Sequence, residues 1–376
     1  MPKMLFINPE AKVNRDIPNI GLAYAATHCR VKIIDLNTRL YPRDRFLKQE
    51  TDVLGISVQS RTWRESVRIA QLYKDKYPQA KVKSISGFLD IQCCYPYLDF
   101  EDKIVFSEPF SDSYSFPDYE LFDSFEMFRK NWQSGVWNYA IMTSQGCPYQ
   151  CIYCWSRKRK WRARSARNCY EELKSAKKRW NIKSFAILDD CFNIDKRRVI
   201  EFCELIKPLQ LTWNCANGLR ADRFDEDMAK AMAASGCEQA SFGVESVLPE
   251  VLEVIKKGES IETIEQALDI AKKHFKKVNG FFIIGLPKSN YAGDLSSLEW
   301  AKKKGINAHF SYYVPFNEVV GHNHIFYGEG ARPVSEEYPE KLQKKIYKMT
   351  KRMRPAGSGK GVSYRIRRQL RKLGLL

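Results

Sequence analysis

The sequence predicts an α/β protein in which a doubly wound, Rossmann-like domain precedes a partial, TIM-like (β/α)6 barrel. In residues 1–110, Val- and Ile-rich apolar runs alternate with helical patterns, as expected for a parallel sheet with helices on both faces. The alternation restarts at Asn138 and gives six strand–helix repeats up to residue 317, which suits a partial barrel. A chain of 376 residues is long enough for both domains.

The first domain, residues 1–110, is built from five expected strands and two expected helices. The strands are KMLFINP, RVKIIDLN, DVLGISVQS, KVKSISGF and KIVFSEP. The helices are IGLAYAATH and TWRESVRIAQLYKDKYPQ, the second with clear helical spacing. Residues 111–137, rich in Ser, Asp, Phe and Tyr, are interpreted as a linker.

The second domain, residues 138–317, carries the six repeats. Its expected strands are NYAIMTS, SFAILDD, LTWNCANG, QASFGVES, VNGFFIIGLP and AHFSYYVPF. Its expected helices are CYEELKSAKKRW, DKRRVIEFCELIK, DEDMAKAMAASG, PEVLEVIKKG and TIEQALDIAKKH. Asp-rich starts supply N-caps, and several helices end just before a glycine.

Polar and reactive residues gather just after these strands, where the active site of such a barrel lies. In chain order they are Gln145 and a cysteine-rich loop, Asp189, Asp190 and Cys191, Asn217 and Arg220, Glu245 and Ser246, and Pro287 and Lys288.

The C-terminal extension, residues 318–376, ends in a basic tail. The net charge of the chain is +18, and residues 341–376 contain thirteen Lys and Arg without Asp or Glu. Two basic amphipathic helices are expected here, KLQKKIYKMTKRM and YRIRRQLRKLGLL. The tail is either a solvated extension or a surface that attracts a phosphate-bearing partner, such as an anionic lipid. Nucleic acid is disfavoured because the tail lacks aromatic stacking platforms.

The cysteine content indicates a reducing compartment. The eleven cysteines are odd in number and scattered, which argues against a disulfide framework. The N-terminus, MPKMLFINPE, lacks the apolar stretch of a signal peptide. No apolar run approaches the length of a membrane span. We therefore expect a cytoplasmic protein, with contact to the inner face of the membrane through the tail left open.

Three cysteines, Cys147, Cys151 and Cys154, lie within one short loop, TSQGCPYQCIYC. The spacing C-x3-C-x2-C can hold three irons of a 4Fe–4S cube and leave the fourth iron open to a substrate. Cysteine thiolates are the soft ligands that such clusters select, and nearby cations favour the thiolate form. A structural zinc site with a fourth, distant ligand is the alternative.

The loop resembles the signature of the radical S-adenosylmethionine (radical SAM) superfamily, C-x3-C-x-aromatic-C, with Tyr153 as the aromatic residue. The resemblance continues in FAILDDCFNID, NCANGLRAD, SFGVESVLPEVL and GFFIIGLPKS, and it points to the subgroup with an N-terminal cobalamin-binding domain. FPDYELFD is similar to the stretch that precedes the cysteine loop in that subgroup.

The resemblance implies a role for each site residue. Cys147, Cys151 and Cys154 would hold a 4Fe–4S cluster, and S-adenosylmethionine would chelate its fourth iron. The cofactor-binding residues would be Tyr153 near adenine, Asp189 and Asp190 at the amine, Glu245 and Ser246 at the ribose or methionine part, Gly285 under the adenine, and Arg220. Asp189 could instead cap the following helix, and Arg220 could form a surface ion pair. Cys191 is the candidate catalytic thiol, a hydrogen donor, unless it only packs in the interior.

The first domain resembles a cobalamin-binding fold that has been reduced. A D-x-H-x-x-G motif is absent, the expected glycine pair is shortened to ISGF, and FSEPFSD replaces a glycine-rich strand end. Glycines permit close approach of the backbone to a cofactor, so cobalamin binding is left open.

The resemblance implies an enzyme that reductively cleaves S-adenosylmethionine to a 5′-deoxyadenosyl radical, which abstracts a hydrogen atom from its substrate. With cobalamin, the outcome would be methyl transfer, as in a methyltransferase. Without it, the outcome would be epimerisation, dehydration or rearrangement. A tRNA-modifying methylthiotransferase and a non-catalytic iron–sulfur protein are the weaker alternatives. The implied partners are a small-molecule or lipid-linked substrate and an electron donor such as flavodoxin or ferredoxin.

Overall fold

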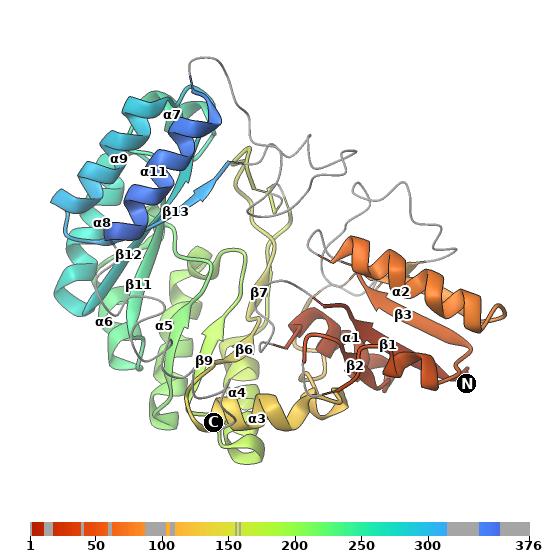
Figure 1. The fold of residues 1–376 in the computed structure, drawn as a ribbon. Coiled ribbons are helices and arrows are strands. Elements are labelled where there is room, and N and C mark those ends of the chain that lie inside the picture. Colours follow the sequence, from red (N-terminus) through yellow and green to blue (C-terminus); the bar gives the residue numbers. More distant parts are fainter. Residues whose placement is uncertain are drawn as a thin grey trace.

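The structure is a computed structural model that describes residues 2–10, 18–38, 41–58, 62–86, 103–105, 110–154, 156–157, 159–313 and 338–353. Figure 1 shows two α/β parts side by side, the N-terminal part in red and orange and the second part from green to blue. Within the described residues, no helix is both long enough and apolar enough to cross a membrane.

The N-terminal part contains a five-stranded parallel sheet among the described residues. The strand order is β2-β1-β3-β4-β5, one of the two common orders of doubly wound domains. The strands are β1 (Met4–Asn8), β2 (Ile33–Asp35), β3 (Val53–Ser57), β4 (Lys81–Ser86) and β5 (Lys103–Val105). The helices are α1 (Ile20–Cys29) and α2 (Trp63–Lys76), with the short 3-10 helix η1 (Arg45–Lys48). The predicted doubly wound sheet is confirmed.

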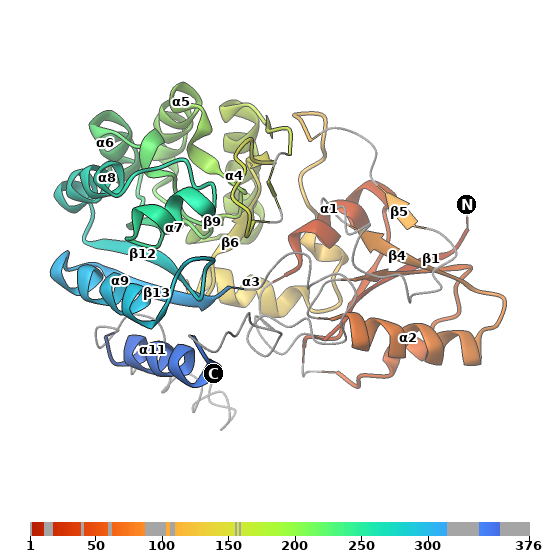
Figure 2. The same cartoon turned by 90° about the horizontal axis from the view of Figure 1, so that it is seen from above.

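The two faces of this sheet belong to different hydrophobic cores, because successive side chains of a strand point to opposite faces. Leu5 and Ile7 of β1 pack in a local core that includes residues of α2. Phe6 of the same strand joins a larger core, together with Leu22 of α1 and many side chains of the second part. Figure 2 shows α1 and α2 on opposite sides of the sheet. The second face therefore fastens the N-terminal part to the rest of the chain.

Residues 111–137, interpreted from the sequence as a linker, are well packed. They contain η2 (Tyr119–Leu121) and α3 (Phe125–Gln133). Tyr119, Phe128 and Trp132 are almost completely buried in the larger core. In α3, Phe125, Phe128 and Trp132 recur at helical spacing, so this segment bridges the two parts rather than merely connecting them.

The second part contains six parallel strands in the described region, in two sheets ordered β6-β9-β10 and β11-β12-β13. The bridges Trp213↔Cys237 and Leu219↔Phe242 join β10 to the chain around β11. The strands are β6 (Tyr139–Ile141), β9 (Ser184–Ile187), β10 (Thr212–Cys215), β11 (Gln239–Glu245), β12 (Lys277–Ile284) and β13 (Asn307–Tyr312). The predicted partial (β/α)6 barrel is confirmed.

Helices cover the outside of this barrel (Figure 1). They are α4 (Ala166–Trp180), α5 (Lys196–Ile206), α6 (Glu226–Ala234), α7 (Pro249–Val254), α8 (Ile261–His274) and α9 (Tyr291–Lys303). The 3-10 helices are η3 (Phe192–Ile194), η4 (Lys207–Leu209) and η5 (Ala221–Arg223). Side-chain N-caps start α4, α5, α6 and α8, and Asn290 caps α9. The sequence analysis did not anticipate α9, whose Gly293 and paired Ser296 and Ser297 weaken the helical pattern.

A helix of the C-terminal extension, α11 (Glu340–Met353), closes the open edge of the barrel beside β13 and α9. Just before it, the Tyr338 hydroxyl donates to the Asp294 carboxylate of α9. The first predicted basic helix is therefore confirmed. The second, YRIRRQLRKLGLL, lies outside the described residues, and its contact with a membrane or a phosphate-bearing partner stays a prediction.

Candidate active site

The three cysteines of the motif lie in one loop at the carboxyl end of the barrel. This cysteine loop, residues 146–154, follows β7 (Ser144–Gln145) and leads to β8 (Arg162–Ala163). The two strands pair as an antiparallel ribbon. Cys151 is buried, and Cys147 and Cys154 are partly exposed. The backbone N–H of Cys154 donates to the carbonyl of Cys151 at 3.1 Å, so the loop forms a tight turn between these two cysteines.

The Asp190 carboxylate, just beyond β9, holds both ends of the cysteine loop. Its Oδ2 accepts a hydrogen bond from the Gly146 N–H at 2.8 Å, and its Oδ1 accepts one from the Ser156 hydroxyl at 2.6 Å. Gly146 has a φ of +87°, and a Cβ there would lie 2.3 Å from the carbonyl oxygen of Lys160. Only glycine permits this close approach in a left-handed conformation.

The neighbouring carboxylate, Asp189, is buried and faces the end of β6. It accepts hydrogen bonds from the Thr143 N–H at 2.6 Å, the Thr143 hydroxyl at 2.5 Å and the Ser144 hydroxyl at 2.6 Å. Burial raises the pKa of Asp189, although Arg198 and these hydrogen bonds act in the opposite direction. Asp189 therefore positions Thr143 and Ser144, which lead into the cysteine loop, and its expected contact with the amine of S-adenosylmethionine stays a prediction.

The middle of the cysteine loop rests on α7 and the chain that follows it. The Ile152 N–H donates to the carbonyl of Ile255 at 3.0 Å. Ile152 and Tyr153 pack against a small apolar cluster that contains Val251, Leu252, Ile255, Leu286 and Tyr313. Burial raises the pKa of the Tyr153 hydroxyl, and the nearby Glu245 adds to the shift.

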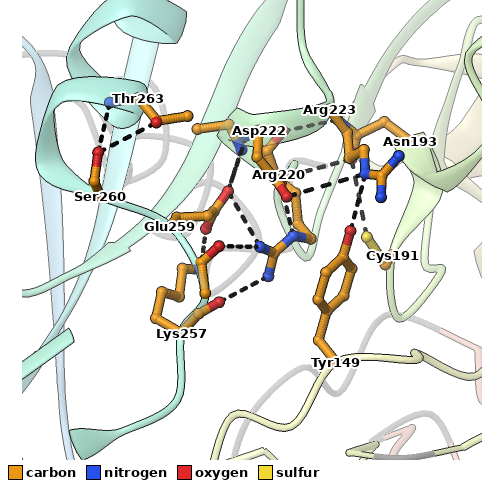
Figure 3. A network of polar contacts seen from close by, with 12 residues as sticks. Tyr149, Cys191, Asn193, Arg220, Asp222, Arg223, Lys257, Glu259, Ser260 and Thr263 are labelled. Atoms are coloured by element: carbon orange, nitrogen blue, oxygen red, sulfur yellow. Dashed lines mark hydrogen bonds and ion pairs between the residues drawn. The ribbon is translucent and has the colours of Figure 1, made fainter. Parts of the chain in front are cut away.

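A cation stacks on the cysteine loop from the barrel side (Figure 3). The Arg220 guanidinium carbon lies 3.4 Å from the centre of the Tyr149 ring. Arg220 also donates to Asp222 at 2.8 Å and to the carbonyl of Lys257 at 3.2 Å. Because Arg220 is buried, it is part of an internal network and not a surface ion pair.

The network continues with two carboxylates around the buried amine of Lys257. The Nζ atom of Lys257 lies 3.1 Å from Glu259 Oε2 and 3.6 Å from Glu245 Oε1. Burial alone would lower the pKa of Lys257, but Glu245 and Glu259 hold it above its usual range. All three side chains are buried. Because an unpaired charge is costly away from water, each of the three charges is stabilised only by its partners.

The pKa values of the four thiols at this end of the barrel are shifted in different directions. The pKa of Cys147 is lowered to about 7, and the largest cause is a hydrogen bond with Cys191. Burial opposes this shift, whereas a hydrogen bond with the Tyr149 backbone and the charge of Arg220 add to it. Burial raises the pKa of Cys154 to about 11, and it also raises the pKa of Cys151, against the effect of Lys257. The shared hydrogen bond with Cys147, and then burial, raise the pKa of Cys191. Cys191 and Cys147 thus shift each other's pKa in opposite directions.

The structure brings most of the predicted site residues together around the cysteine loop. Tyr153, Asp190, Cys191, Arg220 and Glu245 contact the loop or the network beneath it. Ser246 and Gly285 lie at the ends of β11 and β12. The Ser246 hydroxyl accepts the Leu248 N–H at 3.2 Å, and the Gly285 N–H donates to Asp294 at 2.9 Å.

Four contributing residues were missed from the sequence: Tyr149, Ser156, Lys257 and Glu259. Lys257 and Glu259 belong to the run IKKGES after α7, where a charge run usually indicates a solvated surface. Ser156 starts the basic stretch behind the last cysteine. A sequence signal was available only for Tyr149, as an aromatic residue inside the cysteine motif.

The residues present fit a 4Fe–4S cluster. Three thiols share one loop, and the cations Arg220 and Lys257 favour the thiolate forms of Cys147 and Cys151. Among the described residues, no three His, Cys, Asp or Glu side chains converge as the ligands of a single metal ion would. The three cysteines of such a cluster bind three different irons, so they need not converge on one point.

The residues at the carboxyl edge of the N-terminal sheet meet only part of what cobalamin binding requires. Residues 1–110 contain one histidine, His28, which lies in the last turn of α1 and thus away from the carboxyl ends of the strands. At those ends, Asn19 donates to Asn8 and to Ser57, and Asn8 donates to Asp35. This edge offers hydrogen-bonding groups but no histidine ligand for cobalt. The predicted departures at ISGF and FSEPFSD lie largely outside the described residues.

Comparison with known proteins agrees with this geometry. Residues 141–301 match the Radical SAM superfamily. The chain is 35% identical over 182 residues to an uncharacterized methyltransferase of Pyrococcus horikoshii, covering 47% of this chain and 39% of that protein. It is 33% identical to the cytidylyl-2-hydroxyethylphosphonate methyltransferase of Streptomyces wedmorensis, covering 39% of this chain and 28% of that protein. The chain thus spans well under half the length of these relatives.

Solved structures support the fold of both parts. The radical S-adenosylmethionine methyltransferase TsrM of Kitasatospora setae, with its tryptophan substrate and an analogue of S-adenosylmethionine bound, has a TM-score of 0.67 at 16% identity. The match covers 83% of this chain and 72% of that chain. TsrM with cobalamin and a [4Fe-4S] cluster bound has a TM-score of 0.65 at 16% identity and covers 85% of this chain and 77% of its own. Residues 141–301 are therefore similar to the Radical SAM superfamily, and both parts of the chain share the fold of TsrM.

Proposed function

We propose, from the premise that residues 141–301 match the Radical SAM superfamily, that this chain is a radical SAM methyltransferase. Its cysteine loop would bind a 4Fe–4S cluster, and S-adenosylmethionine would be the co-substrate at the open iron. The observation that carries the proposal is the fixed position of three thiols over the barrel mouth, with Asp190 bonded to both ends of their loop.

The cluster, when bound and reduced, supplies the electron that cleaves S-adenosylmethionine. The chain supplies position and environment. The cysteine loop is fixed at three places. Asp190 holds its two ends, the carbonyl of Ile255 holds its middle, and Arg220 stacks on its Tyr149 ring. The apolar cluster under Ile152 and Tyr153 keeps water from the loop on the α7 side. Preorganised groups of this kind need no rearrangement when the reaction occurs.

The buried network of Arg220, Lys257, Glu245 and Glu259 would meet the charged groups of S-adenosylmethionine. Glu245, at the end of β11, has a φ of +66°, a conformation that costs a non-glycine residue energy and is typical of functional sites. Its carboxylate is paired with Lys257 on one side. We assign the ribose or methionine part of the co-substrate to Glu245 and Ser246, and the adenine to Tyr153 and Gly285.

Methyl transfer with cobalamin is favoured by the names of two relatives, which are methyltransferases, and by the fold shared with cobalamin-bound TsrM over both parts of the chain. Cobalamin would lie at the carboxyl edge of the N-terminal sheet, and no histidine of residues 1–110 is available there as a cobalt ligand. Cys191, beside Cys147, would act as the hydrogen donor where the reaction needs one.

A cobalamin-independent radical reaction is the second candidate. One observation favours it: the polar side chains at the described strand ends of the N-terminal sheet, Asn8, Asn19, Asp35 and Ser57, are bonded to one another. An edge that satisfies its own hydrogen bonds has less need of a ligand.

The two candidates are separated by one experiment on the anaerobically reconstituted protein. The protein is incubated with hydroxocobalamin, desalted, and its visible spectrum recorded, and the products from S-adenosylmethionine are then analysed after reduction. Retained cobalamin with S-adenosylhomocysteine among the products supports methyl transfer. Clean loss of cobalamin with 5′-deoxyadenosine supports the second candidate. A fully loaded and reduced protein that cleaves no S-adenosylmethionine would refute both.

A further inference from the structure

A strongly basic segment follows the cysteine loop. Residues 155–164, WSRKRKWRAR, contain six Lys and Arg and no Asp or Glu. Arg164 is buried and paired with Glu172 at 2.5 Å, so this one of the six basic residues has a structural role. Arg157, Lys160 and Arg162 are exposed, and Arg159 is partly exposed. We call these four residues the basic arm.

The basic arm lies directly against the cysteine loop. The Arg157 N–H donates to the carbonyl of Cys154 at 3.3 Å. Arg162 pairs with Gln145 across the antiparallel ribbon of β7 and β8. The backbone carbonyl of Lys160 touches Gly146, the residue before Cys147. Each of these basic residues is thus close, through backbone contacts, to one end of the cysteine loop.

The opposite side of the loop is already covered. Toward the barrel, Tyr149 is stacked on Arg220, and Ile152 and Tyr153 pack on the apolar cluster of α7. Arg223, whose side chain is half exposed, donates to the Tyr149 hydroxyl at 3.0 Å and lies 4.0 Å from the Asp222 carboxylate. Three exposed basic residues, Arg157, Lys160 and Arg162, therefore lie next to the ends of the cysteine loop in the chain or across its backbone contacts.

We propose that the basic arm is the docking surface for an acidic protein that donates one electron to the cluster. The inference rests on the proposed function, because a radical SAM reaction needs a one-electron reductant. The donor is oxidised by one electron, the cluster is reduced by one, and no atom is transferred. A positive surface next to the electron acceptor attracts an acidic donor and orients it toward the cysteine loop.

The test compares two charge-reversal variants of the reconstituted holoenzyme. The arm variant is Arg157→Glu/Lys160→Glu/Arg162→Glu. The control variant is Lys273→Glu/Lys302→Glu/Lys303→Glu. It also reverses three exposed basic residues, at the C-terminal ends of α8 and α9, at the far end of the barrel. Each protein is mixed in a stopped-flow instrument with reduced flavodoxin, an acidic donor, or with the reduced methyl viologen cation. Bleaching of the cluster absorption gives the rate.

We expect the arm variant to accept electrons from flavodoxin about tenfold or more slowly than the wild type at low salt. The difference should shrink at about 0.15 M salt, where the screening length is roughly 8 Å. Reduction by the viologen cation should be unchanged or faster, and the control variant should behave like the wild type with both reductants.

Three results would overturn the docking surface: an unchanged flavodoxin rate in the arm variant, an equal loss in the control variant, or an equal loss with viologen. A fourth would redirect it. If the arm variant is reduced normally but loses binding to vesicles of anionic lipid, the arm serves a membrane and not a donor protein. Because cluster reduction is measured without S-adenosylmethionine, a protein that is reduced normally but cleaves no co-substrate contradicts the proposed function and leaves the docking result intact.

Discussion

The Asp190 carboxylate accepts the Ser156 hydroxyl at 2.6 Å, and through its other oxygen it accepts the Gly146 N–H at 2.8 Å. The two donors lie on either side of the three cysteines. One side chain just beyond β9 thus closes the chain from Gly146 to Ser156, which carries the three cysteines, into a ring. The loop itself is short and leaves two of its cysteines partly exposed. The contact with Asp190 therefore helps the barrel to set the position of the thiols.

Replacement of Asp190 should therefore loosen the cysteine loop. In Asp190→Asn, the amide oxygen can still accept from the Gly146 N–H, but the NH2 group must donate to the Ser156 hydroxyl, so the Ser156 bond is reversed and both bonds lose their charged acceptor. Hydrogen bonds to a charged group contribute about 1.5–3 kcal/mol. We expect less iron bound per chain after reconstitution and faster tryptic cleavage at Arg157 in the metal-free protein. Asp225→Asn, which makes the same change at the N-cap of α6, where Asn caps as well as Asp, is the control and should leave iron binding intact. Normal iron and normal cleavage in Asp190→Asn would contradict this role.

The three motif cysteines should be required for the cluster. Cys147→Ala, Cys151→Ala and Cys154→Ala are each expected to lose most of the iron and the visible absorption after anaerobic reconstitution, because a cube held by two thiolates is weakly bound. Cys169→Ala should retain both, since Cys169 is buried in α4 within the larger core. If a variant without all three motif cysteines kept full iron and absorption, the cluster assignment would be wrong.

Cys191 can be separated from the ligands by the same measurement. It lies outside the motif but beside Cys147, so Cys191→Ala should keep full iron. If Cys191 is the hydrogen donor, Cys191→Ala should lose product formation but still cleave S-adenosylmethionine. Loss of iron in Cys191→Ala would instead make it a ligand, and unchanged product formation would make it a packing residue.

The fold could be predicted from the sequence because each barrel strand is a short apolar run and each helix has a polar face. The positions of the cysteine loop and of Arg220 and Glu245 also follow from that pattern, since parallel strands carry their carboxyl ends to one edge. The burial of residues 111–137 could not be predicted, because Tyr119 and Phe128 find their partners in α1 and the barrel, far away in the chain. The same holds for Lys257, which reads as a surface lysine until its two carboxylate partners are placed around it.

The Lys257 network should be sensitive to the loss of its cation. Lys257→Met leaves Glu245 and Glu259 as like charges in a buried site, and breaking a buried pair in this way costs about 3–5 kcal/mol. We expect a lower midpoint in urea unfolding and weaker binding of S-adenosylmethionine. The double variant Lys257→Met/Glu259→Gln removes one of the stranded charges and should recover part of the stability. Equal stability of Lys257→Met and the wild type would show that the charges are solvated.

Gly146 offers the sharpest test of the loop geometry, because two independent effects oppose a side chain there. Its φ of +87° lies in the left-handed region, and a Cβ would meet the Lys160 carbonyl at 2.3 Å. Gly135 has a φ of +65° but nothing within 4 Å of its Cβ position. Gly135→Ala should therefore cost only the conformational term of about 1–2 kcal/mol and bind iron normally.

Gly146→Ala should cost more than Gly135→Ala, because the added methyl group must push the basic arm away from the loop or pull the Gly146 N–H off Asp190. We expect reduced iron content and an altered electron paramagnetic resonance signal of the reduced cluster, measured with and without S-adenosylmethionine. The difference between the two alanine variants isolates the contact with Lys160 from the backbone conformation. If both variants bind iron like the wild type, the close approach of arm and loop has no part in holding the cluster, and the proposed docking surface loses its structural link to the thiols.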